Sequence, residues 1–251
     1  MTTTSSKPSI PWLVLLGAAL VVVSAILLLA APLGYVTGTL PLRTALLTVF
    51  VWGAYAAAAA AVVSLAGLVL TLRRPKGARR GLALAALSFL LATSFIAIPG
   101  RFRLGDPKPP IHDISTDTQD PPQFVAVLPL RANAPNTTVY GGEKIATQQR
   151  AAYPDLQPYV MNMPPAQAFE RALAAVRTIG WDLVAAEASD GRIEATDTTF
   201  WFRFKDDVII RIRPSGAGSR VDVRSLSRVG GGDVGTNAAR IRAYFDVLKA
   251  S

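Results

Sequence analysis

The acidic residues of this chain are distributed very unevenly, and this constrains its fold more than any other feature. All 17 Asp and Glu residues lie at or after Asp106, whereas the preceding segment is apolar with a few basic residues at its edges. A water-soluble domain normally exposes charges of both signs. We therefore predict a membrane region followed by a water-soluble domain, joined near residue 100.

The membrane region, residues 1–100, contains three candidate spans. A helix needs roughly 20 apolar residues to cross about 30 Å of hydrocarbon, and runs of this kind occupy residues 10–31, 42–72 and 81–98. The second run exceeds one crossing and is expected to tilt or to extend into the interface. A cleaved signal peptide is the alternative for the first run, although its apolar stretch is longer than the roughly 7–15 residues usual there.

The basic residues predict the orientation of these spans. Short loops rich in Lys and Arg stay in the cytoplasm, and the loop between the second and third runs contains Arg73, Arg74, Lys76, Arg79 and Arg80. The N-terminus is then cytoplasmic, and everything after the third span lies on the extracytoplasmic (periplasmic) side of the cytoplasmic inner membrane. The sequence leaves a bacterial or a plastid membrane open.

Composition excludes several kinds of function. Residues 1–100 hold seven of the 26 basic residues, so 19 basic and 17 acidic residues leave the rest of the chain at only +2 of the total +9. We therefore predict no nucleic-acid partner. The chain has no Cys, and His112 is its only His. Disulfides, thiolate catalysis and the usual Cys/His zinc sites are thereby excluded, and no cofactor is expected.

The soluble domain is predicted to be α+β. After a linker, residues 101–120, we expect a domain over residues 111–251 that begins with irregular structure and one strand. A helix follows from Pro164 and Pro165 to Gly180, and a last helix covers residues 237–249. The connections between strands are too short for crossover helices, so the strands should form an antiparallel meander flanked by helices on one face. The predicted strands are residues 181–186, 192–196, 199–204, 208–213 and 220–225.

Alternation along the strands predicts which side chains face the helices. Val208, Ile210 and Ile212 should point into the core, as should Val221 and Val223 on the next strand. The same rule places a set of phenylalanines under the helices and Trp201 on the opposite face, the set being Phe200, Phe202 and Phe204. Helical spacing directs one side of the last helix inward, with Ala238, Ile241, Phe245 and Leu248, and leaves Arg240, Arg242, Asp246 and Lys249 in solvent.

The opposite face of the sheet is predicted to be a basic surface. Arginine guanidinium groups bind phosphate and carboxylate groups through two hydrogen bonds, so the expected ligand is an anionic lipid, an acidic envelope polymer or a partner protein. A solvated face of cross-strand charge pairs, with Arg220, Asp222 and Glu194, is the alternative. The candidate binding residues are Arg211, Arg213, Arg224, Arg228, Asp233 and Arg240.

Residues 230–235 add a glycine-rich turn before the last helix. Such a turn could bind an anion through its backbone amides. The alternative is that Asp233 or Asn237 caps the helix after a flexible turn.

Several polar motifs of the soluble domain resemble one family. They include His112-Asp-Ile-Ser-Thr-Asp117, Pro121-Pro122, Ala195-Thr-Asp-Thr-Thr-Phe-Trp-Phe202, Asp222-Val-Arg-Ser225 and Ser227-Arg-Val-Gly230, with Asp233, Asn237 and Arg240 after them. Over roughly residues 111–248 the chain resembles the bacterial and plastid proteins that carry the domain of unknown function numbered 1499. Three hydrophobic spans before the domain are common in that family. The resemblance supports the fold and the membrane location. It implies no activity, because no activity has been assigned to that family.

Two further readings involve the first motif. Asp113, Asp117 and Asp120 could bind a hard cation such as Ca²⁺, but their spacing fits no EF-hand loop and turn formation also explains them, so no metal is predicted. His112 with Ser115 and a nearby Asp raises an envelope hydrolase as the rival function. No G-x-S-x-G motif occurs in the chain. We therefore expect a non-enzymatic, membrane-anchored binding module.

The second span also carries a ridge of small residues. Gly53, Ala57 and Ala61 recur at a spacing of four residues, and small residues allow helices in a membrane to approach closely. The ridge predicts a close helix contact, either within the chain or between the subunits of a homo-oligomer.

Overall fold

The computed structural model describes residues 9–75, 79–101 and 108–250, and for residues 98–101 it describes the backbone only. The chain divides into two compact units, Met1–Gly105 and Asp106–Ser251. This division agrees with the position of the first acidic residue, Asp106. Each unit has its own core and is described separately.

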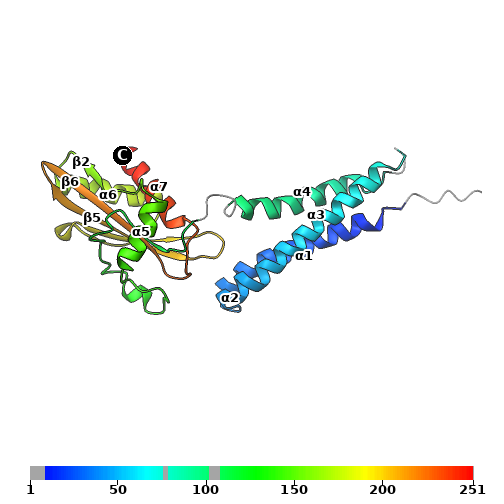
Figure 1. Ribbon diagram of the computed structural model, residues 1–251, viewed down its shortest axis with the longest axis horizontal. Coiled ribbons are helices and arrows are strands. Elements are labelled where there is room, and N and C mark those ends of the chain that lie inside the picture. Colours follow the sequence, from blue (N-terminus) through cyan, green and yellow to red (C-terminus); the bar gives the residue numbers. More distant parts are fainter. Residues whose placement is uncertain (1–8, 76–78, 102–107, 251) are drawn as a thin grey trace, which may run out of the picture. The chain divides into compact units, whose positions relative to one another are not determined.

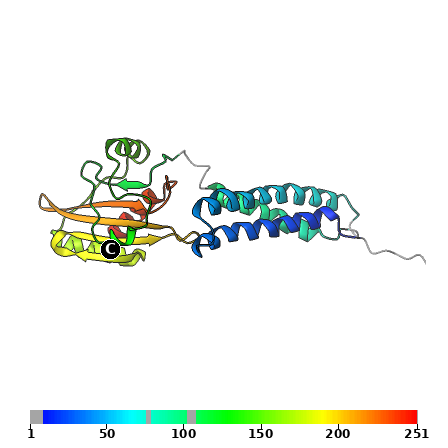
Figure 2. The same cartoon turned by 90° about the horizontal axis from the view of Figure 1, so that it is seen from below.

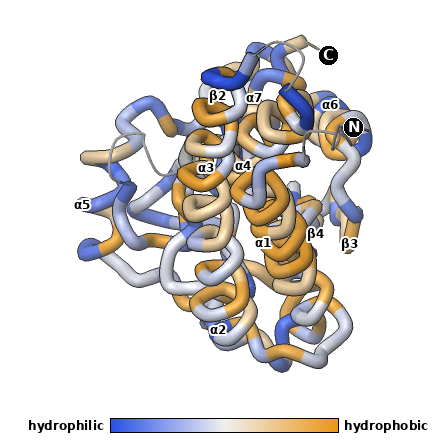
Figure 3. Tube along the Cα trace, turned by 90° about the vertical axis from the view of Figure 1, so that its right-hand side faces the viewer, coloured by the Kyte–Doolittle hydropathy of each residue, from blue (hydrophilic) through white to orange (hydrophobic). Residues whose placement is uncertain are grey.

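The first unit is helical. Its elements are α1 (Trp12–Val36), α2 (Leu42–Thr44), a π-helical turn (Ala45–Val49), α3 (Phe50–Leu72) and α4 (Leu82–Arg101). Two continuous helices are long and apolar enough to cross a membrane, Trp12–Val36 and Leu42–Leu72, whereas the apolar part of α4, Leu82–Ala97, is shorter. Figure 3 shows the hydrophobic character of α1, α3 and α4. Of the three predicted spans, two are therefore supported by length and composition.

The helices of the first unit pack through small side chains and turn large ones outward. Ser24 of α1 donates a hydrogen bond to the carbonyl of Gly53 on α3 over 2.9 Å. A Cβ added to Gly53 would lie 3.0 Å from Leu28 of α1. Gly53 of the predicted small-residue ridge therefore faces α1 of the same chain, and Ala57, one turn further along α3, is also buried. α3 and α4 contribute to one buried cluster with α1, formed by Val21, Ala60 and Ala92.

The second unit contains a six-stranded antiparallel sheet. The strand order is β1-β6-β5-β4-β3, and β2 pairs with β6 beside β1. The strands are β1 (Asp113–Ser115), β2 (Tyr159–Met161), β3 (Asp182–Glu187), β4 (Arg192–Thr198), β5 (Lys205–Ser215) and β6 (Gly218–Ser227). The predicted meander is confirmed for β3 to β6. Residues 113–115 fall in the predicted linker, yet they already belong to the sheet.

Three helices complete this unit, α5 (Gly142–Ala152), α6 (Pro165–Ile179) and α7 (Thr236–Ala250), as Figure 1 shows. α6 begins at a proline and ends before Gly180, which has a φ of 82° and accommodates the left-handed conformation at the helix end. α6 and α7 pack on the side of the sheet formed by Ile210 and Val221, which we call the apolar face. The prediction of two helices on one face is confirmed, whereas α5 lies in a segment that was expected to be irregular.

The prediction of a strand over residues 199–204 is wrong. Thr198 pairs with Lys205, so β4 and β5 form a hairpin and the residues between them form its turn. Phe200 is 79% exposed, which contradicts its predicted place in the core under the helices, and Trp201 beside it is 63% exposed. Alternating aromatic residues imitate a strand here, because the strand pattern does not show where a hairpin reverses.

The second wrong prediction concerns the opposite side of the sheet, which we call the polar face. A covering segment, residues 116–140, runs over it, and Phe124 and Val127 pack on Ile209 and Leu226. Arg224 is 0% exposed and is not on a free surface. Strand alternation correctly grouped the side chains of this face but did not reveal that another segment buries them.

Candidate functional site

Three arginines and three aspartates meet on the polar face, at the end formed by the β5–β6 hairpin. Arg211 and Arg213 of β5 and Arg220 of β6 all contact the carboxylate of Asp222, at 3.0, 3.2 and 2.7 Å. Arg220 also binds Asp117 of the covering segment over 2.6 Å. Arg211 and Arg213 reach Asp120 over 3.1 and 2.8 Å. The predicted alternative of paired charges therefore describes this cluster well.

The aspartates of the covering segment bind the backbone of their own loop and also bind the arginines. Oδ1 of Asp117 accepts hydrogen bonds from the backbone N–H groups of Gln119 and Asp120, at 3.1 and 3.0 Å. Its other oxygen is left for the arginines. The hydrogen bond from Arg213 holds the pKa of the Asp120 carboxyl below its usual value, so this group is ionised at neutral pH.

Arg224 lies in a closed cage beneath the covering segment. Its guanidinium makes a bidentate pair with Asp113 of β1, at 2.9 and 2.7 Å. The remaining donors reach the carbonyls of Pro122 and Thr138 at 3.0 and 2.7 Å. The rings of Phe124 and Tyr140 lie 5.1 and 5.5 Å from the guanidinium carbon. All of these contacts are internal, so the predicted ligand-binding residue Arg224 fastens the covering segment to the sheet.

Two buried carboxylates of the polar face serve the same purpose. Asp207 of β5 accepts from Arg131 and Arg228 at 2.5 and 2.7 Å, and from Thr196 at 2.7 Å. Glu194 of β4 accepts three consecutive backbone N–H groups, those of residues 125–127. The predicted binding residue Arg228 is therefore bound to Asp207.

Arg240 of α7 is buried, contrary to the prediction that it faces solvent. Its guanidinium binds Asp197 of β4 over 2.8 Å and Asp206 of β5 over 2.6 Å. Asp233 accepts the backbone N–H groups of Gly235 and Asn237, both at 2.8 Å, and so fixes the start of α7. The structure therefore uses Asp233 in the capping role that was the alternative to an anion-binding turn.

Neither the metal-binding hypothesis nor the hydrolase hypothesis is supported by a grouped set of side chains in the described residues. Among the residues that the structure describes, no three His, Cys, Asp or Glu side chains are grouped to hold a metal ion. Asp113 and Ser115 are on the polar face of β1, since Asp113 pairs with Leu226. A hydrolase would need a hydrogen bond between His112 and the Ser115 hydroxyl. The Ser115 hydroxyl instead donates to the carbonyl of Asp117 over 2.8 Å.

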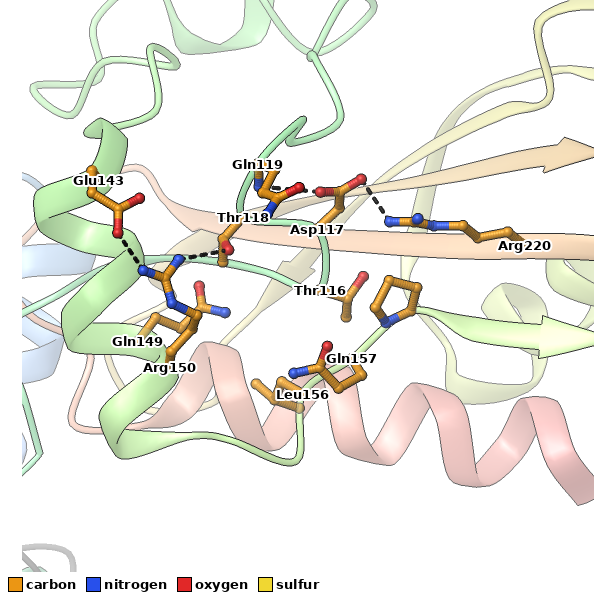
Figure 4. A pocket seen from close by; sticks show the side chains of 11 residues that line it. Thr116, Asp117, Thr118, Gln119, Glu143, Gln149, Arg150, Leu156, Gln157 and Arg220 are labelled. Carbon is orange, nitrogen blue, oxygen red and sulfur yellow. Dashed lines mark hydrogen bonds and ion pairs between the residues drawn. The ribbon is translucent and has the colours of Figure 1, made fainter. Parts of the chain in front are cut away.

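A cavity of about 470 Å³ opens beside the charged cluster. Figure 4 shows Arg220 of β6 on one side of it and Arg150 of α5 on the other, with residues 116–119 of the covering segment between them. The third wall consists of residues 156–158, which lead into β2. Small-molecule sites commonly have volumes of about 300–1,000 Å³. The lining is Thr116, Asp117, Thr118, Gln119, Glu143, Gln149, Arg150, Leu156, Gln157, Pro158 and Arg220.

Hydrogen bonds and ion pairs join the walls of the cavity. Gln149 accepts from the backbone N–H of Ser115 at 2.9 Å and donates to its carbonyl at 2.6 Å, which joins α5 to β1. Arg150 pairs with Glu143 and donates to the Thr118 hydroxyl over 3.2 Å. Arg220 binds its two aspartates through Nε and Nη2 and stays 33% exposed. The guanidinium of Arg220 is thus oriented while part of it faces the cavity.

The sequence predicted part of this arrangement. Of the six candidate binding residues, the structure brings Arg211 and Arg213 together near the cavity. Arg224, Arg228 and Arg240 lie in separate internal clusters. Arg150 and Gln149 were missed, because α5 has little apolar content and Ile145 is its one large apolar side chain. Glu143 and Thr147 are four residues apart and form a hydrogen bond in α5, which is a local signal for a helix.

Comparison with known families gives one match. The family described as "Protein of unknown function (DUF1499)" matches residues 113–248, from β1 to the last turn of α7. No curated protein matches the chain. The matched region includes the sheet, the covering segment, the walls of the cavity and all the internal charge pairs described above. Because the match covers more than half of the chain, the protein belongs to the DUF1499 family.

Proposed function

We propose that this protein is a three-span membrane protein whose extracytoplasmic domain is a non-enzymatic binding module. Its ligand is an anionic component of the cell envelope with a phosphate or carboxylate group on a hydroxyl-rich body. The cavity beside Arg220 is the observation that carries the proposal, because it combines an oriented guanidinium with a polar lining.

The packing of the first unit supports the membrane anchor. Helices in a soluble bundle bury large apolar side chains, whereas helices in lipid pack through small residues. In α1, α3 and α4 the outward side chains include Trp12, Val62 and Leu90, all more than half exposed. The buried positions include Gly17, Ser64 and Ala92. α4 has 20 residues and shares this arrangement, which supports a third span.

The basic loop between α3 and α4 supports the orientation. Arg73, Arg74, Arg79 and Arg80 favour the cytoplasmic side for this loop. With three spans, the domain that follows α4 is then extracytoplasmic. Alkaline phosphatase fused after Ser251 should be active in cells. An inactive phosphatase fusion, together with a fluorescent fusion to green fluorescent protein at the same position, would contradict the orientation.

The lining of the cavity supports the ligand class. Hydroxyl and amide side chains, such as Thr118, Gln119 and Gln157, offer hydrogen bonds to a polyhydroxylated body. Arg220 and Arg150 offer guanidinium groups to an anion. The predicted binding residues Arg211 and Arg213 both contact Asp117, and so help to hold the carboxylate that orients Arg220.

The binding proposal is tested by calorimetry on the full chain in detergent micelles. The probes are D-glucuronate, sn-glycerol 1-phosphate and neutral D-glucose. We expect heat of binding with at least one anionic probe and at least tenfold weaker binding of glucose. Glucuronate favours an acidic glycan as the source of the ligand, and glycerol phosphate favours a phosphate-bearing lipid or polymer.

Variants localise the binding. Arg220→Gln should weaken binding at least tenfold, and Gln157→Trp should block the cavity without touching an ion pair. Arg177→Gln is the matched control, because Arg177 is an exposed arginine in the last turn of α6 and does not line the cavity. Binding that survives both Arg220→Gln and Gln157→Trp would refute the site.

A further inference from the structure

The turn between β4 and β5 is an exposed aromatic projection. Phe200 and Trp201 are 79% and 63% exposed, and their rings meet edge to face at 5.2 Å. The turn is held from below, because the N–H of Thr199 donates to the carbonyl of Phe204 over 2.8 Å and the N–H of Phe204 donates to the Thr199 hydroxyl over 2.9 Å. Two large aromatic side chains are thus presented to the surroundings by a closed turn.

The chain enters the domain at the same end of the sheet. The N–H of Ser227 donates to the carbonyl of His112 over 3.0 Å, and the N–H of Arg228 donates to the carbonyl of Lys205 over 3.0 Å. The start of β1, the end of β6 and the base of the aromatic turn therefore lie together. In Figures 1 and 2 the green start of the domain and the yellow-to-orange turn lie at one end of the sheet.

A third exposed apolar residue lies at this end. Val234, in the loop before α7, is exposed and has a φ of 49°, which is strained for a β-branched residue. The N–H of Asp233 donates to the carbonyl of Ile111 over 3.2 Å, which ties this loop to the entry of the chain. The fold therefore keeps an apolar side chain outside at the end where the tether arrives.

The charges at this end favour an anionic partner. Arg203 and Lys205 of the turn and Lys108 at the entry are exposed. The aspartates of the same end are committed internally, since Asp206 pairs with Arg240 and Asp207 with Arg228. The exposed ionic groups named here are therefore cationic, and Arg203 and Lys205 follow the two aromatic residues closely in the sequence.

We propose that the turn of residues 199–204 docks on the bilayer in which the helices of this chain are anchored. Trp and Phe are favourable at the boundary between headgroups and acyl chains, and Lys and Arg near the surface bind anionic headgroups. Residues 102–107 connect α4 to the domain, and a chain of that length spans at most about 25 Å when extended. The tether thus keeps this end of the domain within reach of the headgroups. The inference rests on the membrane anchor proposed above.

Docking at this end would leave the cavity accessible from water. Arg220 at the cavity precedes Ser227 by seven positions along β6, or about 23 Å at the rise of a β-strand. The end that contacts lipid and the site that binds ligand are therefore at different ends of the same strand. The turn would fix the orientation of the domain and keep the cavity pointed away from the membrane surface.

The test uses the complete chain in liposomes of phosphatidylethanolamine and phosphatidylglycerol. Because the chain has no cysteine, a single cysteine can be introduced and labelled with an environment-sensitive fluorophore. Three positions are compared, each in a lipid mixture with a spin-labelled acyl-chain quencher. They are Phe200→Cys in the turn, Val160→Cys on β2 as an exposed position of the same domain, and Leu90→Cys on α4 as the anchor control.

We expect strong quenching at positions 200 and 90 and at least threefold weaker quenching at position 160. Equal weak quenching at 200 and 160, with position 90 quenched, would overturn the docking and leave the anchor intact. A partner protein would then be the occupant if position 200 became protected in native membranes. Absence of quenching at position 90 would overturn the anchor and the docking together.

The cationic contribution is tested on the same label. Arg203→Glu combined with Lys205→Glu should reduce quenching at position 200 at least twofold, and replacing phosphatidylglycerol with phosphatidylcholine should have the same effect. Both side chains are exposed, so the fold should be retained. Quenching that is unchanged by both the substitutions and the lipid exchange would contradict the headgroup contact.

Discussion

The two faces of the sheet are buried by different physical means. The apolar face packs Ile210, Val221 and similar side chains against α6 and α7. The polar face is covered by an irregular segment that is held by Arg224, Asp207 and Glu194 through ion pairs and hydrogen bonds. Burial of apolar area is non-directional, whereas a buried ion pair requires one geometry. The comparison shows that burial of apolar side chains on the apolar face stabilises this domain. The ion pairs and hydrogen bonds of the polar face fix the position of an irregular segment.

This difference bears on the cavity. One wall of the cavity is the covering segment, residues 116–119 in particular, and these residues have no regular secondary structure of their own. Asp117 fixes them by binding Arg220 and by accepting two backbone N–H groups. The ion pairs of the polar face therefore support the candidate site, although most of them do not line it.

The largest expected effect is the loss of Arg224. In Arg224→Ala, Asp113 is left buried without its partner, and such a change costs about 3–5 kcal/mol. We expect the free energy of unfolding to fall by that amount, measured by pulse proteolysis in urea on the full chain in detergent. The covering segment should become sensitive to protease at lower urea than α6 and α7.

A double variant separates the charge from the packing. Asp113→Leu combined with Arg224→Met removes both charges and keeps apolar volume between Phe124 and Tyr140. Replacement of a buried pair by apolar side chains is often neutral in stability. Recovery of most of the loss seen in Arg224→Ala supports an unpaired charge as the cause, whereas an equal loss in both variants would assign the effect to packing.

The second prediction compares the faces through pH. Burial raises the pKa of Asp207, but hydrogen bonds from Arg228, Thr196 and Arg131 outweigh it and hold the pKa below its usual value. A lowered pKa in the folded state gives stability that is present above the unfolded pKa of about 3.9 and is lost as the pH falls through the folded value. Asp207→Asn should cost about 1.5–3 kcal/mol at pH 6 and less at pH 3.

The apolar face supplies the control for this pH dependence. Ile210→Val removes one methyl group from the core and should cost about 0.5–1.5 kcal/mol. No charge contacts are altered, so the free energy of unfolding should fall equally at pH 6 and pH 3 relative to the unsubstituted chain. A loss from Asp207→Asn that is the same at both pH values would show that its ionisation does not hold the polar face.

The apolar face is also the face that the sequence predicted well. Val208, Ile210 and Ile212 alternate in the sequence, and they all face the core. Gly180 marks the end of α6 because a left-handed residue is required there. These signals are local, since each depends on residues within a few positions in the chain. Local patterns therefore gave the helices α6 and α7 and four of the strands.

The polar face was misread because its partners are remote in the sequence. Arg224 is separated from Asp113 by 111 positions, and alternation along β6 contains no information about that pairing. The cavity was missed for the same reason, since Arg150 and Arg220 come from distant segments. The prediction of a strand over residues 199–204 was wrong for a different reason. Asp197 pairs with Asp206, so the hairpin closes before the aromatic residues are reached. Its exposed rings are the basis of the proposed membrane contact.

The smallest expected effect tests whether position within the fold decides the value of an ion pair. Arg242 and Asp155 form a bidentate pair at 2.6 and 2.8 Å, a geometry similar to that of Arg224 and Asp113, but their side chains are 42% and 53% exposed. Exposed pairs contribute between about 0 and 1 kcal/mol. Asp155→Asn should therefore lower the free energy of unfolding by less than about 1 kcal/mol, measured by the same proteolysis and further reduced at high salt. A loss as large as that from Arg224→Ala would show that geometry alone, and not burial beneath the covering segment, sets the difference between the pairs.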